Sequence, residues 1–471
     1  MKVLGDDEMF LKTNSGKKFA LFALTWPIFI ETLLRILFGN VDTFMLSSYS
    51  DKAVAGVGAA NQFVSIIILV YQVVASGSGI IVSQYIGAQN RKKAAEVVTA
   101  SLLFNLVLGL FMSLVIYLSI DKLLGFMGFE KDVYNYARDF LKIYMSFSFI
   151  ISLSSTITAI LRSYGLMKFP MYAGIGANIL NIFGDCVVLF GLFGMPVLGV
   201  KGVAISTVTS QFVSLAIVFV VLMKKVKIDL RPSYILSIGK ESFKKILSDI
   251  FKIGGPSAGE TLSYNFSQIA ITCIITILGT NSLTARFYVF NLMLFIMLFA
   301  LSIGQATQIQ VGYLVGAGDT DEAYKTCIRS LKISILISFL CAVTMALSAK
   351  PLLSLFTKNQ EIISIGSLLL MMTIILEPGR AFNIVVGNSL RGAGDAKFIM
   401  YLGLVSMWGV AVLISYLLGI RAGLGLVGIW IGFASDEWLR GIIMLMRWRS
   451  RAWEGKSVVV EAVKEECLIH Q

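Results

Sequence analysis

Charged residues are scarce in this chain of 471 residues. They make up 14% of it, whereas 56% of the residues are hydrophobic. Soluble domains carry about 25% charged residues, so this composition excludes an ordinary soluble protein. Histidine is rarer still, because the single histidine, His470, is the penultimate residue. A histidine-based proton relay or a histidine-ligated metal within the apolar part of the chain is therefore excluded.

The chain also lacks the short motifs of metal sites and of nucleotide hydrolysis. The cysteines show no CxxC spacing and are typical of small apolar residues; they are Cys186, Cys273, Cys327, Cys341 and Cys467. No GxxxxGK[ST] string is present, which argues against ATP hydrolysis by this chain. No nucleophile–base pair or set of metal ligands is evident at helical spacing. The sequence therefore predicts no enzymatic activity and no bound cofactor.

What the chain has in abundance is long apolar runs, which recur along its whole length. A run of about 20 apolar residues is long enough to cross a bilayer as a helix. We expect an all-α polytopic membrane protein with twelve transmembrane helices, at residues 19–44, 54–86, 97–120, 135–161, 169–193, 199–223, 250–278, 284–315, 328–348, 362–389, 398–420 and 425–446.

The basic residues indicate how the chain is oriented. The formal net charge is +12, but Lys and Arg cluster between apolar runs rather than along one stripe. This distribution favours a topology signal over nucleic-acid binding. Because the clusters alternate along the chain, the positive-inside rule places both termini in the cytoplasm. Lys17 and Lys18 precede an apolar segment too long for a cleavable signal peptide, so we expect a multi-pass protein of the plasma (inner) membrane.

The chain contains an internal repeat with a constant offset. Pro27, Glu31, Gly87, Arg162 and Lys168 recur 229 residues later as Pro256, Glu260, Gly316, Arg391 and Lys397. Six spans in each copy give two lobes of the same orientation, related by a pseudo-twofold axis along the membrane normal. We predict a cytoplasmic N-terminal segment (1–18), an N-lobe (19–223), a cytoplasmic linker (224–249), a C-lobe (250–446) and a cytoplasmic C-terminal tail (447–471). Nothing in the sequence demands an oligomer, and we expect a monomer.

Polar side chains inside the apolar runs form one constellation in the N-lobe. Asp42 ends the first run, and Asn178, Asn181 and Asp185 share one face of the fifth because they sit at i, i+3 and i+7. Thr207 follows in the sixth run. Two carboxylates with amide and hydroxyl oxygens suit Na⁺, for which Asp42 and Asp185 would be ligands, and they equally suit a proton. The alternative is that these groups only join neighbouring helices, but carboxylates within a membrane are costly and usually functional.

Six strings occur in a characteristic order along the chain: the WP opening, NVDTFMLS, VSQYIGAQN, ANILNIFGDCVVLFG, GVAISTVTSQ and SLRGAGDAKF. In this order they resemble the multidrug and toxic compound extrusion (MATE) family of cation-coupled exporters over nearly the whole chain. The resemblance implies a V-shaped molecule of two six-helix lobes that exports amphipathic or cationic drugs in exchange for Na⁺ or H⁺. The residues that match the family's cation site are Asp42, Asn181, Asp185 and Thr207. Phe38 stands where some members have a tyrosine, and we include Phe38 and Asn178 as weak candidates for the substrate cavity.

The C-lobe departs from the family's second cation site. Glu260 matches a glutamate that some members use there, but Arg380 replaces their aspartate and Ile271 stands opposite Asp42. We therefore favour a local ion pair of Glu377 with Arg380, which Glu260 could join, over a cation site. The main alternative function is a related flippase for a lipid or a lipid-linked sugar. A membrane-embedded enzyme is disfavoured because no nucleophile–base pair or set of metal ligands is evident. A receptor is disfavoured because it rarely needs a duplicated six-span architecture.

Two further charged pairs are predicted from helical spacing alone. Glu31 and Arg35 lie at i, i+4, and Glu437 and Arg440 lie at i, i+3. Side chains at these spacings meet on a helix surface, so we expect each pair to be neutralised locally.

Overall fold

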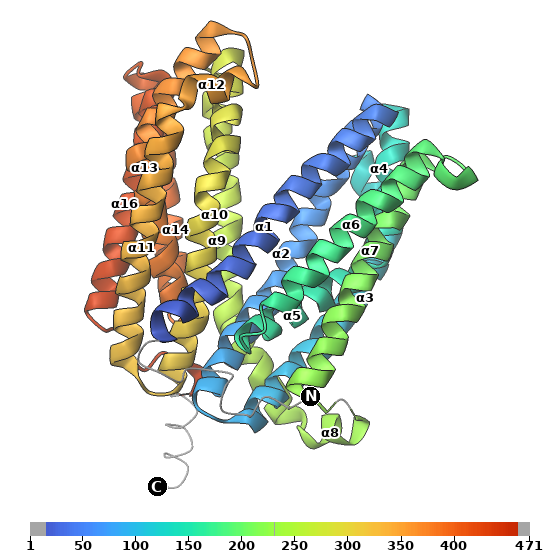
Figure 1. The fold of residues 1–471 in the computed structure, drawn as a ribbon, viewed down its shortest axis with the longest axis vertical. Helices are drawn as coiled ribbons and strands as arrows, with labels where there is room; N and C mark the ends of the chain where they lie inside the picture. Colours follow the sequence, from blue (N-terminus) through green and yellow to red (C-terminus); the bar gives the residue numbers. More distant parts are fainter. Residues whose placement is uncertain (1–15, 230, 460–471) are drawn as a thin grey trace. The chain divides into compact units, whose positions relative to one another are not determined.

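The computed structural model describes residues 16–229 and 231–459, which are helical with short connections (Figure 1). Most of the predicted N-terminal segment, the end of the C-terminal tail, Cys467 and His470 lie outside the described residues. The helices of the first half are α1 (Gly16–Tyr49), α2 (Asp51–Gly87), α3 (Arg91–Gly125), α4 (Lys131–Ser146), α5 (Ser148–Ser163), α6 (Lys168–Phe190), η1 (Leu192–Gly194), α7 (Gly199–Val221) and η2 (Leu222–Val226).

The helices of the second half follow a short helix, α8 (Pro232–Ser237). They are α9 (Lys240–Thr276), α10 (Thr280–Gly316), α11 (Thr320–Leu347), α12 (Ala349–Ser354), α13 (Gln360–Gly392), α14 (Ala396–Ser406), η3 (Met407–Val412), α15 (Leu413–Tyr416), η4 (Leu417–Arg421) and α16 (Gly425–Arg449). The segments η3 and η4 are π-helical turns within one continuous helical span, Ala396–Arg421.

The predicted all-helical membrane architecture is confirmed. Nine single helices of the described chain are long and apolar enough to cross a membrane, and α4 and α5, which meet at 53°, form a tenth span. Two more helices, α9 with 37 residues and α16 with 25, have spanning length but carry more polar and charged residues. With α9 and α16 the described chain has the twelve long helical segments that the apolar runs predict.

Several helices begin before their apolar runs, and α9 begins the furthest before its run. The apolar run predicts a span that begins at residue 250, whereas α9 begins at Lys240. Ile246 and Ile250 are both buried and lie one turn apart, so a packed face continues the helix beyond its apolar part.

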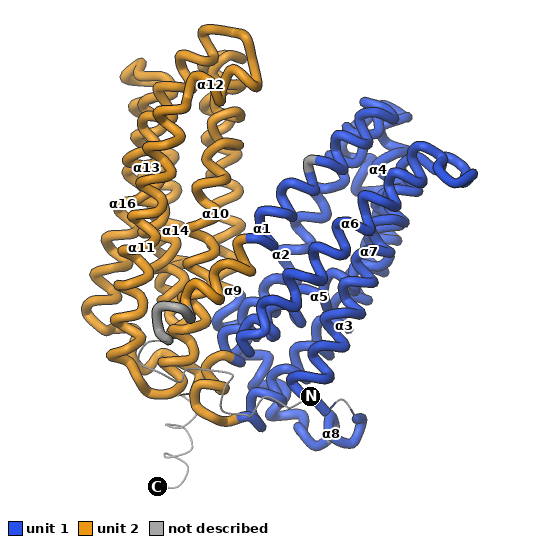
Figure 2. Tube along the Cα trace, in the orientation of Figure 1, with its two compact units in different colours: residues 1–10, 30–82, 91–254 blue, residues 11–29, 83–90, 255–471 orange. Residues whose placement is uncertain are grey.

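The described chain forms two compact units, coloured separately in Figure 2. Unit 1 contains residues 30–82 and 91–254, and unit 2 contains residues 83–90 and 255–459, together with the start of α1 up to Phe29. Each unit has its own apolar core. In unit 1 the core includes Tyr71, Leu124 and Met145, and in unit 2 it includes Ile271, Val289 and Leu370.

Within unit 2 the end of α2 packs tightly against the end of α10. A Cβ atom at Gly87 would lie 1.9 Å from the carbonyl oxygen of Tyr313, and one at Gly316 would lie 1.9 Å from the carbonyl oxygen of Gln84. The two contacts are related by the repeat, since 84 and 313, like 87 and 316, are 229 apart. Only glycine permits backbones to approach so closely, which explains why this residue occurs in both copies.

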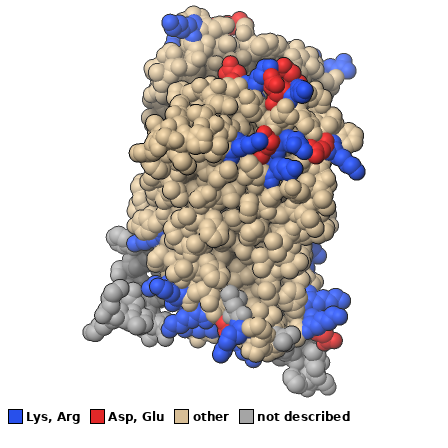
Figure 3. All heavy atoms as spheres, turned by 90° about the vertical axis from the view of Figure 1, so that its right-hand side faces the viewer, with Lys and Arg blue, Asp and Glu red and all other residues tan. Residues whose placement is uncertain are grey.

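Charged side chains avoid the middle of the molecular face in Figure 3. Lys and Arg gather near the lower end of this face, whereas Lys, Arg, Asp and Glu are mixed nearer the upper end. An uncharged band between charged ends is the surface expected of a protein that spans a bilayer.

Candidate functional site

The polar residues predicted on the fifth span come together with residues of the sixth in unit 1. Asn181 and Asp185 on α6 are both buried, and the Asn181 amide donates to Asp185 Oδ1 at 3.3 Å. The same amide lies 3.2 Å from Ser206 Oγ and 3.5 Å from Thr207 Oγ1 on α7. Ser206 Oγ in turn donates to the backbone carbonyl of Asn181 at 3.0 Å. Asn181 therefore connects a carboxylate with two hydroxyl groups.

Helices α6 and α7 meet closely at this point because one residue of α6 has no side chain. A Cβ atom at Gly184 would lie 2.3 Å from Ser206 Oγ. Glycine at this position lets the Ser206 hydroxyl reach the backbone of α6.

Asp42 lies at the wall of a cavity of about 210 Å³ in unit 1. We call this the unit 1 cavity; α1, α2, α4 and α7 line it with Gly39, Asp42, Thr43, Leu46, Val54, Val57, Gly58, Asn61, Phe140, Tyr144, Val203 and Thr207. Asp42 Oδ1 is buried and has no hydrogen-bond partner among the described residues. Asp42 also interacts electrostatically with Asp185. A buried carboxylate oxygen at the wall of this cavity thus lacks a hydrogen-bond partner within the described part of the chain.

The structure brings together four of the six residues predicted in this region. Asp42 and Thr207 line the unit 1 cavity, and Asn181 joins Thr207 to Asp185. Phe38 and Asn178 are not among the residues that line it. Their part in a substrate cavity stays a prediction.

Three polar residues of this region were missed in the sequence. Ser206 is a hydrogen-bond partner of Asn181, while Asn61 and Tyr144 line the cavity. Ser206 precedes Thr207 in the chain, and Asn61 is a polar residue within the second apolar run. These two positions carried a signal, whereas nothing in the sequence relates Tyr144 to Asp42.

Glu31 does not form the predicted pair with Arg35. Its carboxylate accepts from the Arg162 guanidinium on α5 at 2.7 Å. The second unit repeats this contact, since Arg391 on α13 donates to Glu260 on α9. Both partners recur at an offset of 229. Glu260 is therefore engaged by an arginine at the position where the family resemblance would place a cation.

The predicted pair of Glu377 with Arg380 is present and belongs to a buried network in unit 2. Arg380 Nη1 lies 2.6 Å from Glu377 and its Nε lies 3.4 Å from Glu437 on α16. Arg440, also on α16, contacts Asp436 at 2.5 Å and Glu437 at 3.4 Å. Removing one member of such a network would leave an uncompensated buried charge, which is strongly destabilising.

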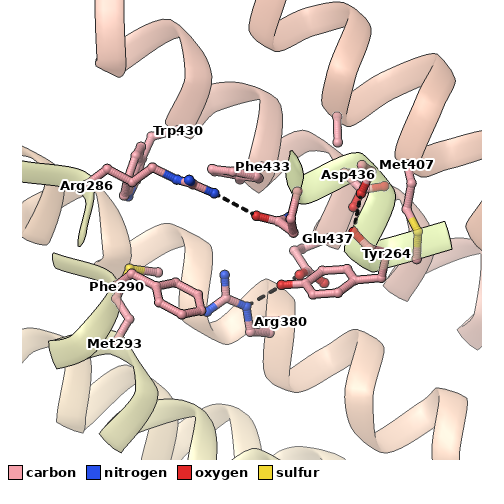
Figure 4. Close-up of a pocket in the computed structure, with 13 residues that line it drawn as sticks. Tyr264, Arg286, Phe290, Met293, Arg380, Met407, Trp430, Phe433, Asp436 and Glu437 are labelled. Atoms are coloured by element: carbon pink, nitrogen blue, oxygen red, sulfur yellow. Dashed lines mark hydrogen bonds and ion pairs between the residues drawn. The ribbon is translucent and has the colours of Figure 1, made fainter. Parts of the chain in front are cut away.

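A second, much smaller cavity lies in unit 2 beside this network (Figure 4). We call it the unit 2 cavity; it has about 20 Å³ of free space and is lined by Tyr264, Ser267, Gln268, Arg286, Phe290, Met293, Arg380, Met407, Ala411, Trp430, Phe433, Asp436 and Glu437. Met407 and Ala411 belong to the π-helical segment η3.

The two cavities lie at equivalent positions of the repeat. At the offset of 229, Gly39, Val57 and Asn61 of the unit 1 cavity correspond to Gln268, Arg286 and Phe290 of the unit 2 cavity. The chemistry of the two cavities differs, because Asp42 corresponds to the buried Ile271.

A repeated bundle of membrane-spanning helices with a polar cavity in each unit is the architecture of a membrane transporter. Comparison with known proteins names the family. A model of the MatE family matches residues 27–187 and 256–417, so the two matches begin 229 residues apart, as the repeat does. The chain belongs to the MatE family of transporters.

Individual relatives agree with this assignment. The uncharacterized transporter YisQ of Bacillus subtilis is 46% identical over 95% of this chain and 98% of its own length. The probable multidrug resistance protein NorM of Thermotoga maritima is 29% identical over 94% of this chain and 95% of its own. Among solved structures, a MATE protein in the bent conformation superposes with a TM-score of 0.84 at 21% identity, covering 97% of this chain and 99% of that one. The chain is thus a multi-pass membrane transporter.

Proposed function

We propose that this chain is a secondary antiporter that exports amphipathic or cationic organic compounds in exchange for Na⁺ or H⁺ bound in the unit 1 cavity. One observation carries the proposal: Asp42 Oδ1 is buried at the cavity wall without a hydrogen-bond partner among the described residues. A carboxylate oxygen in this state gains a partner when it binds a cation or a proton.

The chemistry of the neighbouring groups supports a hard cation or a proton. Asp42 and Asp185 would supply carboxylate oxygens, and Thr207 and Asn181 would supply a hydroxyl and an amide. Oxygen ligands of this kind suit hard cations. The same two carboxylates, close together in an apolar environment, can share a proton instead. Either ion would reduce the repulsion between Asp42 and Asp185.

The size of the unit 1 cavity supports an ion rather than a drug. Its volume is about 210 Å³. Drug-sized ligands occupy pockets of roughly 300–1,000 Å³, whereas a water molecule needs on the order of 10–15 Å³ measured in the same way. The cavity therefore suits an ion with its remaining water ligands, and the exported compound would bind elsewhere.

Exchange requires that the cation and the exported compound favour different states of the transporter. A ligand shifts such an equilibrium only by its difference in affinity for the two states. Binding at Asp42 would favour the state with low affinity for the compound. The membrane potential supplies about 2.3 kcal/mol for each charge per 100 mV, before any concentration gradient is added. We further propose that both termini are cytoplasmic, in a plasma membrane, and that the chain acts as a monomer.

Transport by the purified protein in proteoliposomes tests this function. Ethidium movement would be measured under an imposed Na⁺ gradient and, separately, under an imposed proton gradient. We expect the wild-type protein to transport ethidium in exchange for the ion under one of these two gradients. Asp42→Asn should lower the rate of ethidium transport at least about tenfold, since the amide cannot bind the ion as a carboxylate does.

Asp121→Asn is the matched control for this experiment. Asp121 is an exposed aspartate near the end of α3 that pairs with Arg138. Asp121→Asn removes one negative charge, as Asp42→Asn does, but outside the unit 1 cavity. The ethidium transport rate of Asp121→Asn should therefore equal that of the wild type. Equal rates for wild type and Asp42→Asn under both gradients would refute the proposed coupling site, and absence of ethidium movement by the wild type would refute the proposed substrate class.

A further inference from the structure

Arg286 is a buried arginine of the unit 2 cavity that lacks an acidic partner. Its guanidinium, labelled in Figure 4, belongs to α10. It donates to Gln268 Oε1 at 3.0 Å and to Thr272 Oγ1 at 2.5 Å, both neutral acceptors on α9. No ion pair of Arg286 is present within residues 16–229 and 231–459. Buried arginines are normally paired, because an isolated charge in an apolar environment is costly.

The acidic residues that line the same cavity are committed to other arginines. Asp436 accepts from Arg440 at 2.5 Å and from Ser406 Oγ at 2.6 Å. Glu437 contacts Arg380 and Arg440 at 3.4 Å and accepts from the Asn383 amide at 2.7 Å. These carboxylates are therefore satisfied without Arg286, and Tyr264 is the ionisable neighbour whose electrostatic interaction reaches Arg286.

A second donor of the unit 2 cavity has no acceptor at all among the described residues. Trp430 is 2% exposed, and its Nε1–H has no acceptor in the described part of the chain. A buried indole N–H usually finds a partner, because leaving such a donor without one costs about 1–3 kcal/mol. Trp430 and Arg286 come from different helices, α16 and α10, and line one cavity. Two independent donors thus lack a negatively charged acceptor at the same place.

We propose that the unit 2 cavity binds one small anionic group between Arg286 and Trp430. The free space of about 20 Å³ admits a group the size of a water molecule. A chloride ion or the carboxylate group of an organic molecule meets this limit, and both accept hydrogen bonds from a guanidinium and an indole. The inference does not depend on the cation proposed for unit 1, because it concerns another cavity and other residues.

The repeat strengthens this assignment by showing what unit 1 has in its place. Arg286 corresponds to Val57, and Asp42 corresponds to Ile271. Each cavity therefore carries a charged group that its repeat equivalent lacks. The carboxylate lies in unit 1 and the guanidinium in unit 2. The two copies have become specialised for ions of opposite sign.

Thermal unfolding of the full-length protein in detergent tests the anion site. Sodium methanesulfonate, whose anion has no carboxylate and a larger tetrahedral head group, serves as the reference and keeps Na⁺ constant. It is replaced stepwise by sodium chloride or by sodium formate, and formamide is the neutral match for formate. We expect the unfolding temperature of the wild type to rise saturably with at least one of the two small anions and not with formamide, because only a ligand of the folded state stabilises it in this way.

Two variants and two matched controls locate the site. Arg286→Gln and Trp430→Phe should each raise the half-saturating anion concentration by about tenfold or more, since each loses a hydrogen bond to a charged group. The control variants Arg421→Gln and Trp408→Phe alter an exposed arginine and an exposed tryptophan of unit 2. They should leave the half-saturating anion concentration unchanged. Trp430→Phe keeps an aromatic ring, so it remains informative if Arg286→Gln does not fold.

The two anions also distinguish the sources of the anionic group. Saturation by chloride alone would identify an inorganic ion, and saturation by formate, with or without chloride, would identify a carboxylate. The proposal would be overturned if neither anion gave a saturable effect, or if Arg286→Gln and Trp430→Phe kept the wild-type half-saturation. If chloride saturates the site, crystals grown with bromide provide a direct check: an anomalous peak is expected beside Arg286 and Trp430, and its absence from the cavity would then contradict the site.

Discussion

Asn181 is the residue that links the polar groups of unit 1. Its amide is within hydrogen-bond distance of Asp185, Ser206 and Thr207, while Ser206 returns a hydrogen bond to the Asn181 backbone. A chain of hydrogen bonds in an apolar environment fixes the position of each member. Displacing Ser206 should therefore alter the position of Asn181 and, through it, that of Asp185.

A glycine of α6 offers a way to displace Ser206 without changing a polar residue. In Gly184→Ala the new Cβ would lie 2.3 Å from Ser206 Oγ, so the serine must rotate away from Asn181. Overpacking of this kind costs about 1–3 kcal/mol. We expect a lower unfolding temperature and a several-fold slower transport rate, both measured on purified protein.

Gly176→Ala, on the same helix, is the control for this substitution. Apart from the adjoining backbone of its own helix, no described atom lies within 4 Å of a Cβ at position 176. Alanine in place of a helical glycine is usually stabilising by about 0.5–1 kcal/mol. Equal transport and equal unfolding temperatures for the two variants would show that Ser206 is not positioned by this contact.

At the scale of single residues, the sequence predicts the acidic and amide groups of the unit 1 site but not all of the residues around them. Asn181 and Asp185 were found because polar residues one turn apart are conspicuous in an apolar helix. Ser206 was missed because serine is common in membrane helices, where it usually bonds its own backbone. Tyr144 was missed because its nearness to Asp42 depends on the packing of α4 against the other helices of the cavity.

At the scale of elements, two ion pairs tie corresponding helices together. Glu31 on α1 pairs with Arg162 on α5, and Glu260 on α9 pairs with Arg391 on α13. Each pair joins residues 131 positions apart. Such long-range pairs fix how the first helix of each copy packs against a later one.

Helical spacing alone led to the wrong partner for Glu31. Glu31 and Arg35 are at i, i+4, but Arg162 is the partner that the structure shows. The repeat held the necessary signal. Glu31 and Arg162 recur as Glu260 and Arg391, whereas Arg35 corresponds to Tyr264. A pair that is present in both copies of the repeat therefore cannot include Arg35.

A double-mutant cycle on the unit 2 pair measures its contribution. Glu260→Gln leaves Arg391 without its carboxylate, and we expect a loss of about 2 kcal/mol, below the 3–5 kcal/mol of a fully buried pair because the Arg391 side chain is 21% exposed. Adding Arg391→Gln should restore part of this loss, since the unpaired charge is then removed. Thermal unfolding gives each value.

If Glu260 binds a cation rather than Arg391, the double-mutant cycle should give a different result. If the losses of Glu260→Gln and Arg391→Gln simply added in the double variant, the ion pair would not be the stabilising interaction. A cation would then remain a possible partner of Glu260, as the family resemblance suggests. The paired geometry favours a structural role.

At the scale of the whole molecule, the sequence predicts the architecture well because hydropathy and the repeat act over long stretches. The apolar runs locate the twelve long helical segments, and the matches to the MatE family begin 229 residues apart. The early start of α9 at Lys240 was not predicted, because its first turns are polar and are helical through the packing of Ile246 and Ile250.

Duplication of the sequence does not determine which charged residue lines the cavity of each unit. Equivalent positions line a cavity in each unit, yet Asp42 faces one cavity and Arg286 the other. The unit 2 cavity could not be predicted from the sequence, because Arg286, Trp430 and Glu437 come from three separated helices. Only the folded unit shows that Arg286 lacks the acidic partner that Arg380 and Arg440 have.

The central claim is that a cation at Asp42 and the exported compound oppose one another. Coupling between two ligands is reciprocal and is typically worth 1–3 kcal/mol, or about 5–150-fold in affinity. It can therefore be measured at equilibrium, without a membrane. Potassium replaces Na⁺ at constant chloride, so that the unit 2 cavity experiences the same anion throughout.

The most direct measurement is the affinity of purified protein for ethidium, at low and high Na⁺ and at high and low pH, for wild type and Asp42→Asn. We predict that Na⁺ or H⁺ weakens ethidium binding by the wild type about tenfold. Asp42→Asn should bind ethidium with an affinity that does not depend on the concentration of either cation. A wild-type affinity unchanged by both ions, or an equal decrease in Asp42→Asn, would contradict the proposed coupling.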